Sequence, residues 1–194
     1  MTEPRIPPLP PKEWPPQMRD AIAALLPENP RHPRPVTEGR PKGLNVLGTL
    51  AQHVELATAY HRFNGHVLFA TSLSPRQREL LVLRVAAIRD CEYEWAQHVV
   101  IAGDAGITDE EVERIADGPD APGWSEVDAA MVRCVDELVA DACVTDATWA
   151  VLSKSYSTEQ LMDAVFTVGQ YNLVSWALNS FGVPLDDFLP GAKK

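Results

Sequence analysis

The sequence predicts an all-α protein, and three observations carry that prediction. From residue 44 onward apolar residues recur at helical spacing, and no segment reads convincingly as a strand. The residues between these apolar segments are also more typical of helix caps than of hairpin turns. With 194 residues and 45% hydrophobic content, the chain has ample material for one core, so we expect a bundle of about eight helices.

The first 43 residues differ in composition from the rest. They hold 12 of the 17 prolines and carry a net charge of +2, against −12 for the remainder. Proline removes backbone donors and favours extended chain. We therefore predict an N-terminal arm over residues 1–43, with one short helix at 15–26, and a helical domain over 44–194. The alternatives are an arm docked on a core or a neighbouring subunit through Ile22, Leu25 and Leu26, and a free tail.

Helix-capping residues indicate where the helices of that domain begin and end. Residues 45–70 should form one or two helices, broken near His53 or Gly65. Ser74, Pro75 and Gln77 supply an N-cap, a first helical residue and a capping-box partner, which together mark a strong helix start. The helices expected from there on are 75–88, 91–105, 108–117, 125–142, 146–154 and 157–180.

Charge and cysteine content narrow the function. A net charge of −10 and a pI near 4.9 disfavour nucleic acid and anionic membrane surfaces, which leaves a small molecule or a protein as partner. No apolar run approaches the roughly 18 to 20 residues of a membrane span, and the start lacks the apolar core of a secretory signal. Three widely spaced cysteines, Cys91, Cys134 and Cys143, fit reduced thiols, so we expect a cytoplasmic protein.

The stretch "CEYEWAQH", residues 91–98, gathers candidate functional groups. On a helix, Cys91, Trp95 and His98 share a face, with Glu94 slightly further round. If Asp90 is the N-cap, the free backbone N–H groups around Cys91 favour a thiolate and a lowered pKa. Neighbouring acids and an apolar pocket favour the thiol and a raised pKa, so both directions stay open.

The preceding helix adds a carboxylate. It is apolar almost all round, so Glu79 should be buried and needs a partner. If the two helices pack antiparallel, Glu79 and His98 lie less than one turn apart in height, within reach of a hydrogen bond. Glu79 would then orient His98, which reaches back toward Cys91 as a proton relay. In the purely structural alternative, Glu79 pairs with Arg78 or Arg84, and Cys91 is a small buried hydrophobe.

This pattern resembles the core of the carboxymuconolactone decarboxylase family, which includes the alkylhydroperoxidase D proteins. Glu79, Cys91 and His98 match its spacing, as does the continuation "AGDAGITDEEVERI". The resemblance covers residues 74–116 firmly and 44–182 loosely, and it implies an alkylhydroperoxidase D-like helical fold and homo-oligomers, trimers or hexamers. Glu94 stands where the redox branch of the family has the second cysteine of its Cys-x-x-Cys motif.

That substitution directs the functional prediction, because Glu94 cannot close a disulfide with Cys91. The resemblance is then to the decarboxylase branch, which works without a cofactor on a carboxylated lactone. We predict acid–base chemistry on a small molecule, with Glu79, Cys91, His98 and Glu94 as catalytic residues. The alternatives are a monothiol antioxidant that reduces peroxides through Cys91, and a non-catalytic binding or assembly module.

Four further residues are candidates for binding the substrate. Tyr60, His61 and Asn64 lie on neighbouring helical positions, and Trp95 accompanies Cys91. They could line the same pocket, or lie in the core, at an interface or toward solvent. We expect no metal and no cofactor, because the combination of Glu94, His98 and His61 matches no established carboxylate–histidine spacing.

Overall fold

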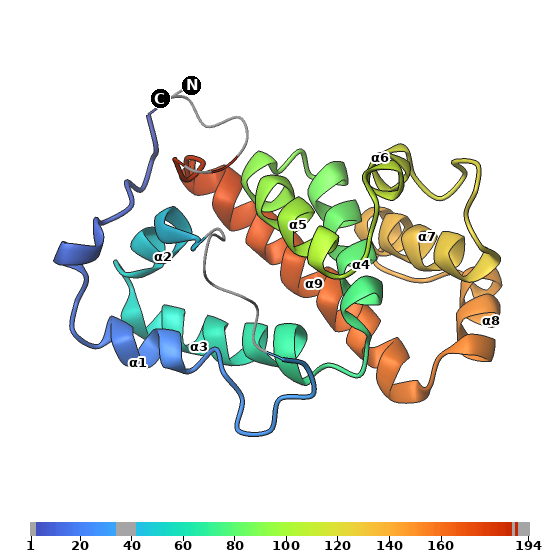
Figure 1. Ribbon diagram of the computed structural model, residues 1–194, viewed down its shortest axis with the longest axis horizontal. Coiled ribbons are helices and arrows are strands. Elements are labelled where there is room, and N and C mark those ends of the chain that lie inside the picture. The colour runs from blue at the N-terminus through green and yellow to red at the C-terminus, as the bar shows by residue number, and fades with distance from the viewer. Residues whose placement is uncertain (1–2, 34–41, 188, 190–194) are drawn as a thin grey trace. The chain divides into compact units, whose positions relative to one another are not determined.

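The computed structural model describes residues 3–33, 42–187 and 189 (Figure 1). Over that part of the chain it contains nine α-helices and no strand, which confirms the predicted all-α fold. The chain divides into two compact units, one formed by residues 1–71 with 177–194 and the other by 72–176. The predicted division after residue 43 stays a prediction.

In the first unit the arm packs on two helices. A 3₁₀ turn, Pro11–Glu13, precedes α1, Met18–Ala23; α2 is Leu44–Leu50, and α3 is Val54–Gly65, continued by a π-helical segment, His66–Ala70. Helix α1 is shorter than the predicted 15–26, because consecutive prolines precede it and Pro27 follows it. The break at His53 is confirmed: its ring accepts a hydrogen bond from Leu56 N–H as the N-cap of α3. Buried Met18 and Ala21 pack with Ala51 and Ala57.

Two glycines let the arm approach these helices closely. The Leu9 N–H donates to the Gly48 carbonyl at 3.1 Å, and a Cβ on Gly48 would run into the Leu9 carbonyl oxygen. A Cβ on Gly65 would run into the Leu25 carbonyl oxygen in the same way. Both obstacles are backbone atoms, which cannot move aside as the end of a flexible side chain can. The structure therefore favours the docked arm over the free tail.

Replacing Gly48 with alanine should loosen the arm. We expect a loss of about 1 to 3 kcal/mol in the free energy of unfolding, the usual cost of overpacking, and faster tryptic cleavage after Arg19. The matched control is Gly103→Ala on α5, where an added Cβ meets nothing within 4 Å. That variant should gain about 0.5 to 1 kcal/mol from its better helix propensity. Equal cleavage rates in both variants would refute the docked arm.

The second unit is a bundle around α4. Helix α4, Pro75–Ile88, packs against α5, Glu92–Asp104, α6, Asp109–Asp117, and α7, Glu126–Asp141; α8, Asp146–Ser155, packs on α7. Helix α9, Thr158–Phe181, contributes its residues up to 176. The core holds the side chains of Leu80, Leu83, Ala102, Ile107 and Ile115. Because α4 touches three helices, most of its sides are buried, as its apolar sequence predicts.

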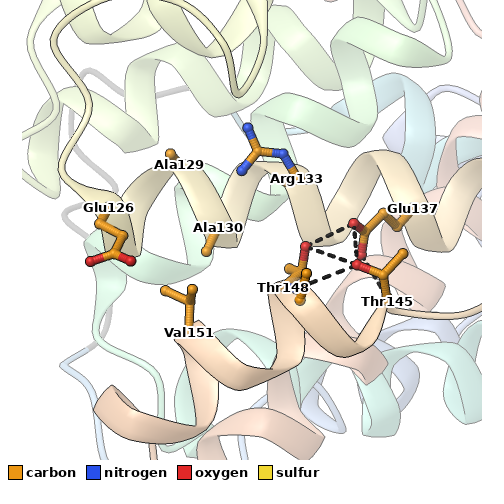
Figure 2. Close-up of a pocket in the computed structure, with 9 residues that line it drawn as sticks. Glu126, Ala129, Ala130, Arg133, Glu137, Thr145, Thr148 and Val151 are labelled. Carbon is orange, nitrogen blue, oxygen red and sulfur yellow. Dashed lines mark hydrogen bonds between the residues drawn. The ribbon is translucent and has the colours of Figure 1, made fainter.

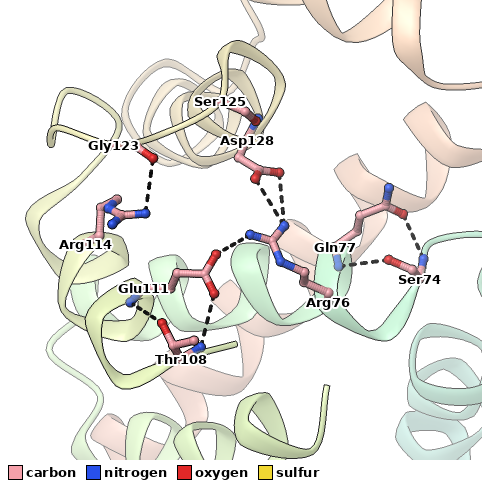
Figure 3. Close-up of polar contacts among 9 residues, drawn as sticks. All are labelled: Ser74, Arg76, Gln77, Thr108, Glu111, Arg114, Gly123, Ser125 and Asp128. Carbon is pink, nitrogen blue, oxygen red and sulfur yellow. Dashed lines mark hydrogen bonds and ion pairs between the residues drawn. The ribbon is translucent and has the colours of Figure 1, made fainter. Parts of the chain in front are cut away.

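Polar contacts fix how the helices of the second unit begin (Figure 3). The predicted capping box of Ser74 and Gln77 is present, and Thr108 and Glu111 form a second one. The Arg76 guanidinium, in the first turn of α4, donates to both Glu111 on α6 and Asp128 on α7. These three helix starts are thereby held together. No helix over the described ranges is long and apolar enough to span a membrane.

Candidate active site

The short turn between α4 and α5 positions Cys91 and the start of α5. Asp90 has a left-handed backbone with φ of 48°, and the Cys91 N–H donates to the Ala86 carbonyl at 3.0 Å. Together with the Asp90 N–H bond to Ala87 at 3.3 Å, this is the Schellman pattern that ends a helix. Asp90 therefore terminates α4, and the N-cap of α5 is Cys91. The prediction that Asp90 caps α5 was wrong by one residue.

Glu79 lies at the centre of a buried polar cluster. It has no exposed surface, its Oε2 lies 2.7 Å from His98 Nδ1, and its Oε1 accepts from Arg78 Nε at 2.8 Å. Burial acts to raise the pKa of Glu79, but the charges and hydrogen bonds of His98 and Arg78 outweigh it and lower the pKa. The predicted bond to His98 is therefore formed, and Arg78 is a second partner. Arg84 instead pairs with Asp136.

The pairing assigns the ring atoms of His98 their roles. Because Glu79 is ionised and can only accept, His98 Nδ1 must carry the proton of the 2.7 Å bond. The other nitrogen, Nε2, is then the atom that can take up or release a proton. Tyr171 of α9 packs edge-on against the ring, with centroids 4.9 Å apart and planes at 87°. Two contacts thus hold the ring orientation, and His98 is 8% exposed while Glu79 is fully buried.

Glu94 is the second buried carboxyl group, in a different state. It is 2% exposed, its Oε2 lies 3.1 Å from the Ser175 hydroxyl, and its Oε1 has no hydrogen-bond partner. Burial raises its pKa well above the usual value, Ser175 opposes that shift, and the charge of Glu79 adds to it. Burial therefore favours the protonated form of Glu94, beside the ionised Glu79. Ser175 was missed from sequence, where it is one hydroxyl in a mostly apolar helix.

Cys91 lies beside Glu94 and Ser175 and is 1% exposed. Burial and the charge of Glu94 raise the pKa of its thiol to about 11, although the Glu94 backbone N–H and the Ser175 hydroxyl oppose the shift. The sequence left open whether the pKa of Cys91 is raised or lowered, and in the structure it is raised. The structure thus brings Glu79 together with His98, and Cys91 together with Glu94. The relay from His98 to Cys91 stays a prediction.

Thiol labelling should reflect this environment. At neutral pH the exposed Cys143 should react rapidly with a thiol reagent, whereas Cys91 and the buried Cys134, with its pKa raised to about 12, should react only on unfolding. Cys143→Ser should therefore abolish fast labelling of the native protein. Fast labelling of Cys91 at pH 7 would contradict the buried thiol.

The residues predicted to bind substrate are divided between the two units. The Trp95 ring is partly buried and packs on the core around Leu80 and Ile115. Tyr60, His61 and Asn64 belong to α3 of the first unit, where His61 Nδ1 lies 2.9 Å from the Ala21 carbonyl oxygen. Burial lowers the pKa of His61, although the bond to Ala21 opposes this. Asn64 is buried with its Oδ1 unpaired. Their part in substrate binding stays a prediction.

A separate pocket of about 450 Å³ lies between α7 and α8 (Figure 2). None of the predicted catalytic residues lines it. At its wall the Glu137 carboxylate accepts hydrogen bonds from the Thr145 N–H and from the hydroxyls of Thr145 and Thr148, at 2.7 to 2.8 Å. These bonds cap the start of α8, so the polar groups already have structural partners. Over the described ranges, no three His, Cys, Asp or Glu side chains are grouped so as to hold a metal ion.

Comparison with known proteins identifies the class. Residues 55–137 match the model of the carboxymuconolactone decarboxylase family, and this part of the chain holds Glu79, Cys91, Glu94 and His98. The resemblance predicted from the sequence is thereby confirmed. A search of curated proteins finds no match.

Solved structures show the same fold. An uncharacterized peroxidase-related protein from Silicibacter sp. TM1040 is 18% identical, with 99% of this chain and 98% of its own covered and a TM-score of 0.75. A putative antioxidant defence protein AhpD from Agrobacterium tumefaciens is 19% identical, with 71% and 94% covered and a TM-score of 0.66. The apo debrominase Bmp8 is 13% identical, with 94% and 92% covered and a TM-score of 0.68. The predicted alkylhydroperoxidase D-like fold is confirmed.

Proposed function

We propose that the protein is a cofactor-free enzyme that carries out acid–base chemistry of the decarboxylase type on a small carboxylated or lactone-like molecule. The observation that carries the proposal is the buried pair of Glu79 and His98, 2.7 Å apart, with the buried Glu94, whose pKa is raised, beside it. The ionised Glu79 can orient His98, while a carboxyl group whose protonated form is favoured can act as an acid.

The proposed reaction needs a proton at carbon. When a substrate carboxylate leaves as carbon dioxide, the electron pair of the broken carbon–carbon bond passes into an enolate-like intermediate. His98 Nε2 or the Glu94 carboxyl then donates a proton to that carbon, and the acid regains a proton from water. Glu79 takes no proton, because Arg78 and His98 hold it as an anion. Arg78 also compensates Glu79 when His98 is neutral, so His98 can release its proton without leaving a buried charge unpaired.

A monothiol peroxidase is the alternative, and the environment of Cys91 disfavours it. With a pKa of about 11, only about one thiol in 10⁴ is ionised at pH 7. Peroxide reduction needs the thiolate as nucleophile. A non-catalytic module is disfavoured in turn because Glu94 is a buried carboxyl group with one oxygen unpaired, a costly arrangement that is typical of functional sites.

Carbon dioxide release tests the proposal. Chelator-treated protein should release carbon dioxide from at least one member of a panel of small carboxylated lactones, and in D₂O the product should carry one new carbon-bound deuterium. Cys91→Ser should leave this activity partly intact, because the proposed proton donors are His98 and Glu94. Peroxide turnover with an external thiol, abolished by Cys91→Ser and unaccompanied by carbon dioxide release, would establish the antioxidant alternative.

The proposal also covers the compartment and the self-association of the enzyme. Three free cysteines support a reducing compartment, the cytoplasm. The resemblance to the family supports self-association as trimers or hexamers. Four large apolar side chains on one helix are more than half exposed, which supports it further: Met162, Phe166, Leu173 and Trp176.

A further inference from the structure

Helix α9 has a second apolar face, opposite the one that packs into the bundle. Its inward side carries Tyr171 and Ser175, which contact His98 and Glu94. Its outward side carries Met162, Phe166, Leu173 and Trp176, which are 51 to 58% exposed. A helix that is apolar all round is normally buried all round. We call these four residues, with Gly169 between them, the α9 seam.

The spacing in the seam is that of helix-to-helix packing. Residues 162, 166, 169, 173 and 176 are separated by four, three, four and three positions, which is the alternation of a coiled-coil stripe. A Cβ placed on Gly169 would meet nothing within 4 Å, so this glycine is not required by packing inside the chain. A small residue in the middle of an apolar stripe lets a second helix backbone come close.

The seam is also nearly symmetric about Gly169. Met162 and Trp176 lie seven positions to either side, and Phe166 and Leu173 lie three and four positions away. A second copy of α9 running antiparallel would place Met162 opposite Trp176 and Phe166 opposite Leu173. Each pair then joins an aromatic ring to a flexible aliphatic side chain. A parallel copy would place the two bulky Trp176 rings opposite each other.

We propose that the α9 seam is a two-fold contact with a second copy of this chain, in which two α9 helices cross antiparallel at Gly169. This rests on the proposed self-association and specifies one of its contacts. A two-fold contact builds a dimer, or a hexamer made of three such pairs, and it excludes an isolated trimer. Because α9 also carries Ser175 and Tyr171, the contact would brace the helix that lines the candidate active site.

The size of the seam agrees with such a contact. Half of the surface of four large side chains is about 400 Å² per copy, roughly half of what a standard interface buries on each partner. The seam is then the apolar centre, and the residues flanking it form the polar rim. Arg89 lies at this edge, with its guanidinium 5.9 Å from the Trp176 ring centroid and bonded to Asn172. Arginine and tryptophan are frequent anchors of interfaces.

Cysteine cross-linking tests the antiparallel crossing of the two α9 helices. In a Cys143→Ser background, which removes the exposed native thiol, Gly169→Cys should oxidise to a covalent dimer, since the two positions meet at the axis. Met162→Cys should not, because its two copies lie about 20 Å apart in the antiparallel pair. Cross-linking of Met162→Cys, or failure of Gly169→Cys, would overturn the proposal.

Sedimentation separates failure of the seam from failure of self-association. Leu173→Glu should reduce the mass of the wild-type assembly by about half, whereas Leu56→Glu, at a 52% exposed site on α3, should not change it. A wild-type trimer, or a Leu173→Glu variant of unchanged mass, overturns the seam and leaves self-association standing. A wild-type monomer of 21.3 kDa at micromolar concentration overturns both.

Discussion

Replacing Glu79 with glutamine should lower turnover by about 10²- to 10⁴-fold, and His98→Ala should do the same. Glutamine keeps the size of Glu79 but removes the anion that fixes the proton on His98 Nδ1 and compensates the imidazolium. Because the two residues act on one proton, the double variant should be little worse than the poorer single variant. The measurement is a double-mutant cycle on kcat with the substrate that the carbon dioxide assay finds.

The control for that cycle is Glu137→Gln. Glu137 is another hydrogen-bonded carboxylate of the same unit, and the bonds from Thr145 and Thr148 lower its pKa despite the opposing effect of burial. It belongs to α7, and its carboxylate caps the start of α8, outside the site. Turnover of folded Glu137→Gln should match the wild type. If Glu79→Gln and His98→Ala kept full turnover and lost only stability, the pair would be structural.

The two buried carboxyl groups should affect stability in opposite ways. Removing Glu79 leaves Arg78 and His98 without their shared anion, so Glu79→Gln should cost about 3 to 5 kcal/mol in the free energy of unfolding at neutral pH. The folded pKa of Glu79 lies below the usual 4.5. Its stabilisation is therefore complete above pH 4.5 and disappears as the pH falls through the folded value.

For Glu94 the sign reverses. Its folded pKa lies above 4.5, so as the pH rises past that value the unfolded chain loses the proton first and stability falls. The slope is at most about 1.4 kcal/mol per pH unit until the folded pKa is reached. Glu94→Gln cannot ionise and should gain stability relative to wild type over this range. Denaturant unfolding at several pH values measures both effects, and a Glu94→Gln difference that is constant with pH would refute the buried acid.

The sequence predicted the Glu79–His98 contact because two regular features determine it. Helical spacing fixes the heights of both residues, and the apolar surroundings of Glu79 require a polar partner. It did not predict the left-handed Asp90, because the end of α4 and the start of α5 compete for the same residues. Whether Asp90 ends one helix or caps the next depends on backbone geometry that composition does not reveal.

Ser175 and the state of Cys91 lay beyond sequence reasoning for another reason. Ser175 lies about 80 positions from Glu94, and no local pattern aligns α9 with α5. The pKa of Cys91 depends on the balance between burial, which raises it, and nearby donors, which lower it, and that balance follows from tertiary packing. The N-terminal arm was predicted as a separate segment from its prolines, whereas the two glycines that receive it became meaningful only beside Leu9 and Leu25.

Glu79 holds the proton of the neutral His98 ring on Nδ1, which leaves Nε2 to accept or donate a proton. Nitrogen NMR of the His98 ring in the native protein tests this most directly, and it requires no substrate. In the neutral ring, Nδ1 should carry the proton and Nε2 should be bare, and Glu79→Gln should release this preference. A neutral His98 with its proton on Nε2 and a bare Nδ1 would contradict this role of Glu79.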